Sequence, residues 1–156
     1  MTIELNEEEA KMLKSVLVNQ VLDGEYSWNI YVADMIHKVI NQLDNTSINT
    51  ELLEETVKPI IGILSKWNDG HLIRWYIKDN KSSEYRKSED DEKDIKKCFE
   101  TGYLSTFYSY IDGVAVVDEY SDYAIKFSTK YITITVRISK NEDSYYMIED
   151  IKNILN

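Results

Sequence analysis

Residues 131–138 read YITITVRI, an unbroken alternation of apolar and polar side chains. Because successive side chains of a β-strand point to opposite faces of its sheet, this stretch predicts a strand with one buried face. The predicted buried face comprises Ile132, Ile134, Val136 and Ile138. The opposite face comprises Tyr131, Thr133, Thr135 and Arg137.

The sequence before this strand predicts an antiparallel meander between residues 104 and 139. Residues 123–127 (YAIKF) alternate as well, and Ser128-Thr129-Lys130 supplies a turn between the two strands. Further upstream, Asp112-Gly113 separates residues 107–111 from residues 114–117, and Asp-Gly is a strong signal for a two-residue hairpin.

This hairpin register would put Tyr108 and Tyr110 on one sheet face with Ala115 and Val117. Both faces of the predicted hairpin are then partly apolar, although a solvated sheet face is usually polar. Two alternatives follow: helices cover both faces, or the face with Tyr108 and Tyr110 is a contact surface.

The flanking segments complete the second half of the chain. Residues 71–79 contain β-prone residues and predict a strand, residues 81–91 predict a polar loop, and residues 88–100 predict a short helix with apolar Ile95, Cys98 and Phe99. After residues 141–143 we expect a terminal helix. Its predicted apolar stripe comprises Met147, Ile148, Ile151, Ile154 and Leu155.

The first half of the chain predicts three helices. Asn6 and Glu9 form a capping-box pair for the first, which Asp23-Gly24 would end. Residues 28–43 carry an apolar stripe at helical spacing. A third helix is expected after Asn49-Thr50, with a kink or a restart at Pro59.

These elements predict an α+β fold. About three N-terminal helices precede an antiparallel β-meander of about four to five strands and a C-terminal helix. The 156 residues are expected to form a single domain, 1–156, with a helical half (1–70) and a sheet-containing half (71–156).

Composition excludes several classes of function. The net charge is −10, and residues 1–55 hold 11 acids against three bases, so phosphate backbones and anionic membrane surfaces would repel the chain. No apolar stretch approaches a membrane span, the acidic N-terminus lacks a signal-peptide pattern, and the single cysteine cannot form an intrachain disulfide. We expect a cytoplasmic protein, in its own cell or in an infected host cell, with no direct binding to nucleic acid or membrane.

No catalytic, cofactor or metal motif is recognisable. The five glycines form no phosphate-binding loop, and no His or Cys pair has zinc-ligand spacing, so we expect no cofactor and no metal. The only carboxylate cluster near the predicted strands is Asp118, Glu119 and Asp122. An enzyme of unrecognised type would use this cluster with His71, which requires the four groups to converge.

Tyrosine is the remaining unusual feature, with 12 in the chain and eight between residues 103 and 146. Tyrosine suits interfaces because it joins an apolar ring to a polar tip, although the AT-rich codons of a low-GC genome would also raise its frequency. The residues predicted to contact a partner are Tyr108, Tyr110, Tyr120, Tyr131, Glu7, Glu8, Asp118 and Glu119.

The sequence therefore favours a small acidic inhibitor that binds a larger, basic protein. Immunity proteins and phage-encoded inhibitors of host defence in low-GC bacteria share this profile, and acidic mimicry of nucleic acid is one special case. The alternatives are the enzyme described above and a structural or assembly subunit, for which we expect stable self-association through an apolar surface.

Overall fold

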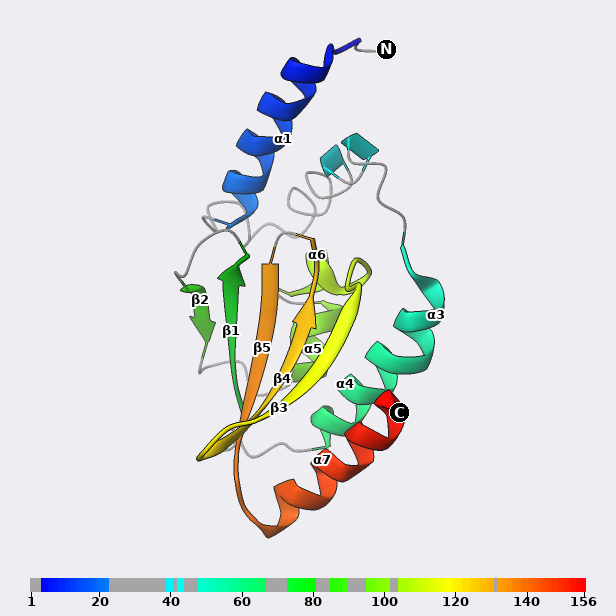
Figure 1. Ribbon diagram of the computed structural model, residues 1–156, viewed down its shortest axis with the longest axis vertical. Helices are drawn as coiled ribbons and strands as arrows, with labels where there is room; N and C mark the ends of the chain where they lie inside the picture. Colours follow the sequence, from blue (N-terminus) through cyan, green and yellow to red (C-terminus); the bar gives the residue numbers. More distant parts are fainter. Residues whose placement is uncertain are drawn as a thin grey trace.

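The computed structural model has one five-stranded antiparallel sheet with helices packed against one of its faces (Figure 1). Helices precede the sheet and one helix follows it, so the predicted α+β class is confirmed. The structure describes residues 4–22, 39–40, 42–43, 48–66, 73–80, 85–89, 95–101, 104–130 and 132–156.

The alternating residues 132–138 belong to the central strand of the sheet. The strand order is β2-β1-β5-β4-β3, where β5 (Ile132–Ser139) pairs with β1 (Ile73–Asp79) on one side and with β4 (Asp122–Ser128) on the other. The four apolar residues of β5 that were predicted to share a face are all fully buried. The alternation of β5 arises because one of its faces packs against the core while the other carries polar residues.

Strand β2 (Tyr85–Glu89) corrects the loop predicted for residues 81–91 and the helix start predicted near Ser88. Its sequence YRKSE has no apolar alternation, so it gave no strand signal. Pairing with β1, with an irregularity between Ile77 and Lys78, supplies the backbone hydrogen bonds that define the strand. The later part of that predicted helix exists as α5 (Ile95–Glu100), with Ile95, Cys98 and Phe99 buried as expected.

The hairpin predicted at Asp112-Gly113 was wrong. Residues 107–111 form no strand, because α6 (Ser105–Tyr108) and a following turn occupy this segment. Leu104, Phe107 and Ile111 are buried at positions i, i+3 and i+7, which is helical spacing. The face predicted to carry Tyr108 and Tyr110 beside Ala115 and Val117 therefore does not exist.

Gly113 instead begins β3 (Gly113–Asp118), the outer strand next to β4. The two strands are joined through Tyr120 and Ser121, where the backbone N–H of Glu119 donates to the carbonyl of Asp122 at 3.0 Å. Thus β3 pairs forward with β4 rather than backward with residues 107–111.

The first helix forms where it was predicted, and the stop predicted at Asp23-Gly24 lies outside the described residues. α1 (Glu7–Leu22) begins at the capping pair, in which the Asn6 side chain accepts from the Glu9 N–H and the Glu9 carboxylate accepts from the Asn6 N–H, both at 2.9 Å. Leu17 packs against the core, whereas Leu13 and Val16 are exposed. Of the helix predicted over residues 28–43, residues 39–40 and 42–43 are described and helical, and the others lie outside the described residues.

Helical structure continues through Pro59 rather than restarting there. α3 (Thr50–Leu52) continues into a π-helical turn, η1 (Leu53–Val57), and then into α4 (Lys58–Ser65), whose first turn contains the proline. The Lys58 N–H donates to the Leu53 carbonyl five residues earlier, whereas Pro59 has no N–H to donate to the preceding turn. The wider turn therefore lets one helical segment run on past a residue that would otherwise break it.

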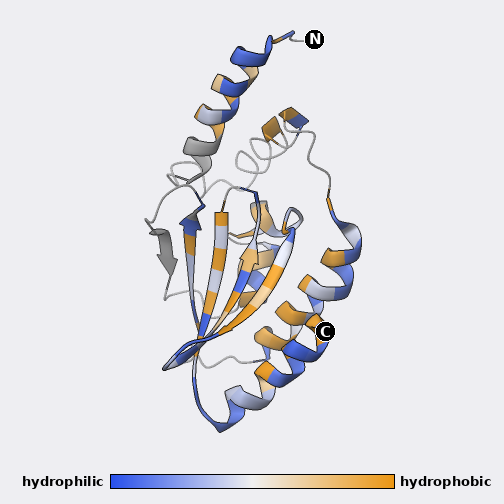
Figure 2. Ribbon diagram, in the orientation of Figure 1, coloured by the Kyte–Doolittle hydropathy of each residue, from blue (hydrophilic) through white to orange (hydrophobic). Residues whose placement is uncertain are grey.

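The terminal helix α7 (Glu142–Leu155) buries Met147, Ile148 and Ile151 against the core, as its stripe predicted. Figure 2 shows apolar and polar residues mixed along α7, beside α4. Buried side chains from the helices and from the inner face of the sheet form one hydrophobic cluster. No helix among the described residues has the length and apolarity needed to cross a bilayer.

Candidate functional site

The predicted carboxylate cluster of Asp118, Glu119 and Asp122 lies at the β3–β4 turn, where a basic side chain stands beside each carboxylate. We call Arg74, Asp118, Glu119, Asp122, Arg137 and Lys140 the hairpin cluster. The Arg137 guanidinium is 2.6 Å from the Glu119 carboxylate, and Arg74 is 3.6 Å from Asp122. Lys140 pairs with Asp118, and its ammonium lies 5.0 Å from the centre of the Tyr123 ring.

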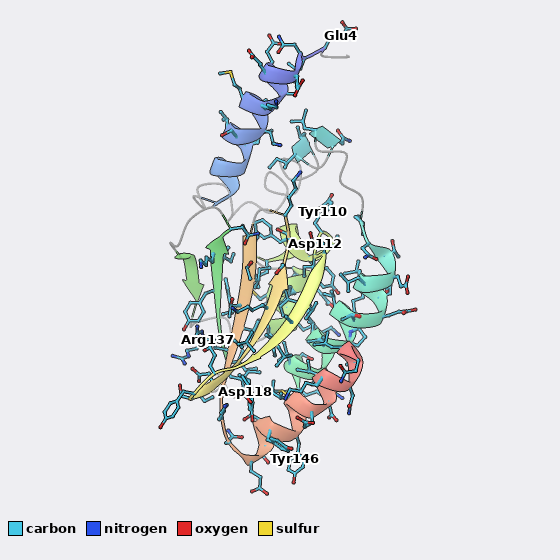
Figure 3. All side chains as sticks on the ribbon, in the orientation of Figure 1. Glu4, Tyr110, Asp112, Asp118, Arg137 and Tyr146 are labelled. Atoms are coloured by element: carbon cyan, nitrogen blue, oxygen red, sulfur yellow. The ribbon has the colours of Figure 1, made fainter. Side chains whose placement is uncertain are left out.

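This cluster ties the turn to the sheet and to the start of α7. The Lys140 backbone N–H donates to the Ser121 carbonyl at 3.0 Å, and Asp122 is itself buried. Figure 3 shows Asp118 and Arg137 together at this end of the sheet. Because a base stands beside each carboxylate, the cluster has the features of a structural ion-pair network. His71 lies outside the described residues, so the proposed convergence with it stays a prediction.

The predicted tyrosines do not form one surface. Tyr120 is fully exposed at the tip of the β3–β4 turn, whereas Tyr108 is half-buried with its ring centre 6.2 Å from that of Phe99. Tyr110 is half-buried at the opposite end of the sheet from Asp118 (Figure 3). Tyr131 lies outside the described residues. The structure therefore leaves Tyr120 as the fully exposed member of the set among those it describes.

Burial raises the pKa of the Tyr108 phenol from 10.0 to about 12, with further contributions from the negative charges of Glu100 and Glu54. Since the fold favours the neutral phenol, this contribution to stability is complete below pH 10.0 and is lost as the pH rises through about 12. We expect the absorbance at 295 nm to show a tyrosinate step near pH 12 that Tyr108→Phe removes and Tyr120→Phe retains. A step that persists in Tyr108→Phe would show that another phenol produces it.

Glu7 and Glu8 are exposed in the first turn of α1, where carboxylates favour the positive end of the helix dipole. α1 extends away from the sheet, at the opposite end of the molecule from the first turn of α7 (Figure 1). In Figure 3 the same separation is visible between Glu4 and Tyr146. The two predicted glutamates therefore cannot share a small contact surface with the hairpin cluster.

A second site, absent from the predicted set, lies between the end of α4 and the first turns of α7. Here an open groove of about 330 Å³ is lined by Ile63, Lys66, Asp143, Tyr146, Met147 and Asp150. Met147 is buried and Ile63 is half-buried, while Asp143, Tyr146 and Asp150 are exposed. The groove thus has an apolar floor with an aromatic ring and two carboxylates at its rim, and Lys66 offsets part of their charge.

The cap of α7 fixes the geometry of this α4–α7 groove. The Asn141 side chain accepts from the Ser144 N–H at 2.7 Å, and the Ser144 hydroxyl accepts from the Asn141 N–H at 2.8 Å. Ser144 is fully buried, so this capping box anchors the turn that carries Asp143 and Tyr146.

Tyr145 and Tyr146 stand beside each other on this turn. Their ring centres are 5.5 Å apart in an edge-to-face arrangement, and the residues are 50% and 62% exposed. The apolar stripe of α7 already contained the signal, because Met147, Ile148 and Ile151 face inward and leave the two tyrosines off that face. Tyr145 and Tyr146 are therefore better interface candidates than Tyr108 and Tyr110, which are half-buried.

These groups suit a basic side chain. The aliphatic stem of an arginine or lysine can pack on Met147 and Ile63, and its charged head can meet a carboxylate or the face of Tyr146. Within the part of the chain that the structure describes, no cluster of His, Cys, Asp and Glu has the composition of a metal site.

No protein-family model, curated protein or solved structure matches the chain. The function is therefore inferred from the chemistry of its own surface.

Proposed function

We propose that this chain is a small acidic binding protein that inhibits or neutralises a larger, basic protein. Its place of action would be the cytoplasm of a low-GC bacterium or of a cell infected by its phage, as an immunity protein or an inhibitor of host defence. Acidic mimicry of nucleic acid is the special case in which the partner's blocked site is a nucleic-acid channel.

The observation that carries this proposal is the α4–α7 groove beside the exposed pair Tyr145 and Tyr146. Paired exposed tyrosines next to a concave, partly apolar surface have the composition of an interface hot spot. The carboxylates of Asp143 and Asp150 favour a basic side chain as the occupant, since either can pair with an arginine or lysine that enters the groove.

The overall charge supports the same partner class. A net charge of −10 attracts a basic protein over several ångströms beyond contact and repels acidic ones. Glu7 and Glu8 lie far from the groove, so we assign them to long-range attraction and the groove to short-range contact. Attraction of this kind raises the association rate and weakens as salt screens the charges.

The test is affinity capture from low-GC bacterial lysates at low salt, followed by calorimetry with the purified partner. We expect the double variant Asp143→Asn/Asp150→Asn to raise the Kd about fivefold, because each lost carboxylate contributes a few tenths to about 1 kcal/mol at an exposed rim.

Glu7→Gln/Glu8→Gln is the matched control, since it removes the same two charges at the other end of the molecule. It should lower the association rate and leave the dissociation rate nearly unchanged. Recovery of no partner at low salt would contradict the proposed function. Equal changes in Kd for the two double variants would contradict the groove as the contact surface.

A further inference from the structure

Strand β3 is an outer edge of the sheet formed by the described strands. The pair Glu119 and Asp122 is hydrogen-bonded, as the 3.0 Å bond at the turn shows. Hydrogen-bonded pairs alternate along an antiparallel ladder, so Val117, Ala115 and Gly113 direct their N–H and C=O groups toward β4. Val114, Val116 and Asp118 therefore direct theirs outward, and no described residue forms a hydrogen bond with those groups.

The usual protection of an edge strand is missing from β3. Natural edges carry a lysine, a proline, a bulge or an inward-pointing charge, whereas the sequence GVAVVD has no such feature before its final residue. Residues 113–118 pair with β4 in one register, and the register shifts only before the strand, where the Asp112 N–H donates to the Ser128 carbonyl at 2.8 Å. Figure 2 shows it as a largely apolar strand at the margin of the sheet.

Burial shows that the helices stop short of covering this strand. On the inner face, Val114 and Val116 are only half-buried, although Ile125 and Phe127 on the adjacent β4 are fully buried. On the outer face, Ala115 and Val117 are exposed. Both faces of β3 thus keep apolar surface that another strand beside it would cover.

We propose that β3 is a self-association surface that pairs antiparallel with β3 of a second copy of this chain. This inference concerns a surface distinct from the α4–α7 groove and is independent of the proposed function. A two-fold axis beside Val116 sets the register, in which Val116 faces its own counterpart and Val114 faces Asp118 of the second copy. Each of the three outward residues then exchanges both backbone hydrogen bonds with its counterpart.

Side-chain chemistry favours this symmetric register. It places valine against valine at the axis and Ala115 against Val117 on the outer face, and such apolar cross-strand pairs stabilise a sheet. The two Asp118 carboxylates are offset by four residues, about 14 Å at the rise of a strand. This exceeds the Debye length of about 8 Å at physiological salt, so they repel each other weakly.

Sedimentation equilibrium provides the direct test. At about 1 M salt, where charge repulsion between two chains of net charge −10 is screened, we expect a species of twice the 18.3 kDa chain mass at high protein concentration. At about 0.01 M salt the dimer fraction should fall. A wild-type chain that stays monomeric at about 1 mM and high salt, where even a millimolar Kd would be visible, overturns the proposal.

Val116→Pro tests the surface. Proline at this position removes an outward N–H and leaves the bonds between β3 and β4, so the chain should keep its far-ultraviolet circular dichroism and become monomeric. A folded Val116→Pro that still dimerises overturns the proposal, because another surface would then be responsible.

Two single cysteine variants test the register. They also test whether β3 pairs with β3 of a second copy if Val116→Pro fails to fold. In the dimer, Val116→Cys places two cysteines about 5.5 Å apart between Cα atoms, within the range of a disulfide. Val114→Cys, on the same face and also half-buried, places them about 14 Å apart. We expect oxidation to cross-link only Val116→Cys, and equal cross-linking of both variants would overturn the register.

Discussion

A Phe127→Ala variant will lose about 3–5 kcal/mol of unfolding free energy. Phe127 is fully buried on the inner face of β4, and its ring centre is 5.2 Å from that of Phe99 on α5. Truncation removes the apolar surface that joins the sheet to the helical layer and leaves a cavity, because neighbouring strands cannot collapse into it. Because the free energy of unfolding of a small protein is only about 5–15 kcal/mol, this loss is a large fraction of its stability.

Urea denaturation monitored by far-ultraviolet circular dichroism measures this loss as a fall in the midpoint. Tyr120→Ala is the control, because Tyr120 is an aromatic residue that is fully exposed and should change stability by no more than about 0.5 kcal/mol. Similar midpoints for the two variants would mean that Phe127 does not lie in the core.

An Asn141→Ala variant is expected to lose about 1–2 kcal/mol of unfolding free energy. The side chain accepts the Ser144 N–H at 2.7 Å, and its removal leaves that donor without its cap at a turn whose serine is fully buried. α7 packs Met147, Ile148 and Ile151 into the core, so fraying at its first turn weakens the global fold. The same denaturation experiment measures the effect.

Asn6→Ala provides a matched control for this prediction. Asn6 makes the same kind of capping pair at α1, with a 2.9 Å bond from the Glu9 N–H. α1 reaches the core through Leu17 and leaves Leu13 and Val16 exposed, so its local fraying should hardly change global unfolding. If Asn6→Ala costs as much as Asn141→Ala, α1 is coupled to the core more tightly than these contacts indicate.

Prediction from sequence succeeded where the local pattern and the tertiary environment agree. Within the alternation predicted over residues 131–138, residues 132–138 belong to the central strand, and the predicted pair of Asn6 and Glu9 forms a helix cap. These signals are strong because they depend on residues close in sequence. A capping side chain bonds to a backbone group a few positions away, and the buried residues of a strand recur at every second position.

Prediction failed where a local signal had two interpretations or none. The segment before Asp112-Gly113 fits a strand with a hairpin turn, and it fits equally a short helix and turn that bury Leu104, Phe107 and Ile111. Packing against the core selected the helix and turn. β2 has no apolar pattern at all and exists because β1 offers it a hydrogen-bonding edge. Neither outcome could be decided from the residues alone.

The candidate surfaces likewise depend on residues that are distant in sequence. Asp118 and Glu119 were predicted to contact a partner, but in the fold Lys140 pairs with Asp118 and Arg137 with Glu119. The groove brings Ile63 and Lys66 of the first half of the chain to Tyr146 and Asp150 of the last helix. No spacing rule in the sequence connects segments some 80 residues apart.

The sequence by itself determined the acidic charge, the α+β class, the core strand and the helix caps, because composition, period and capping depend on near neighbours. Tertiary structure alone decided which tyrosines are exposed, which acids are paired with bases, and which strand is left at the edge of the sheet. These properties depend on contacts between segments that are distant in sequence. Such contacts form only when the chain folds, because they are set by burial in a shared core and by strand pairing.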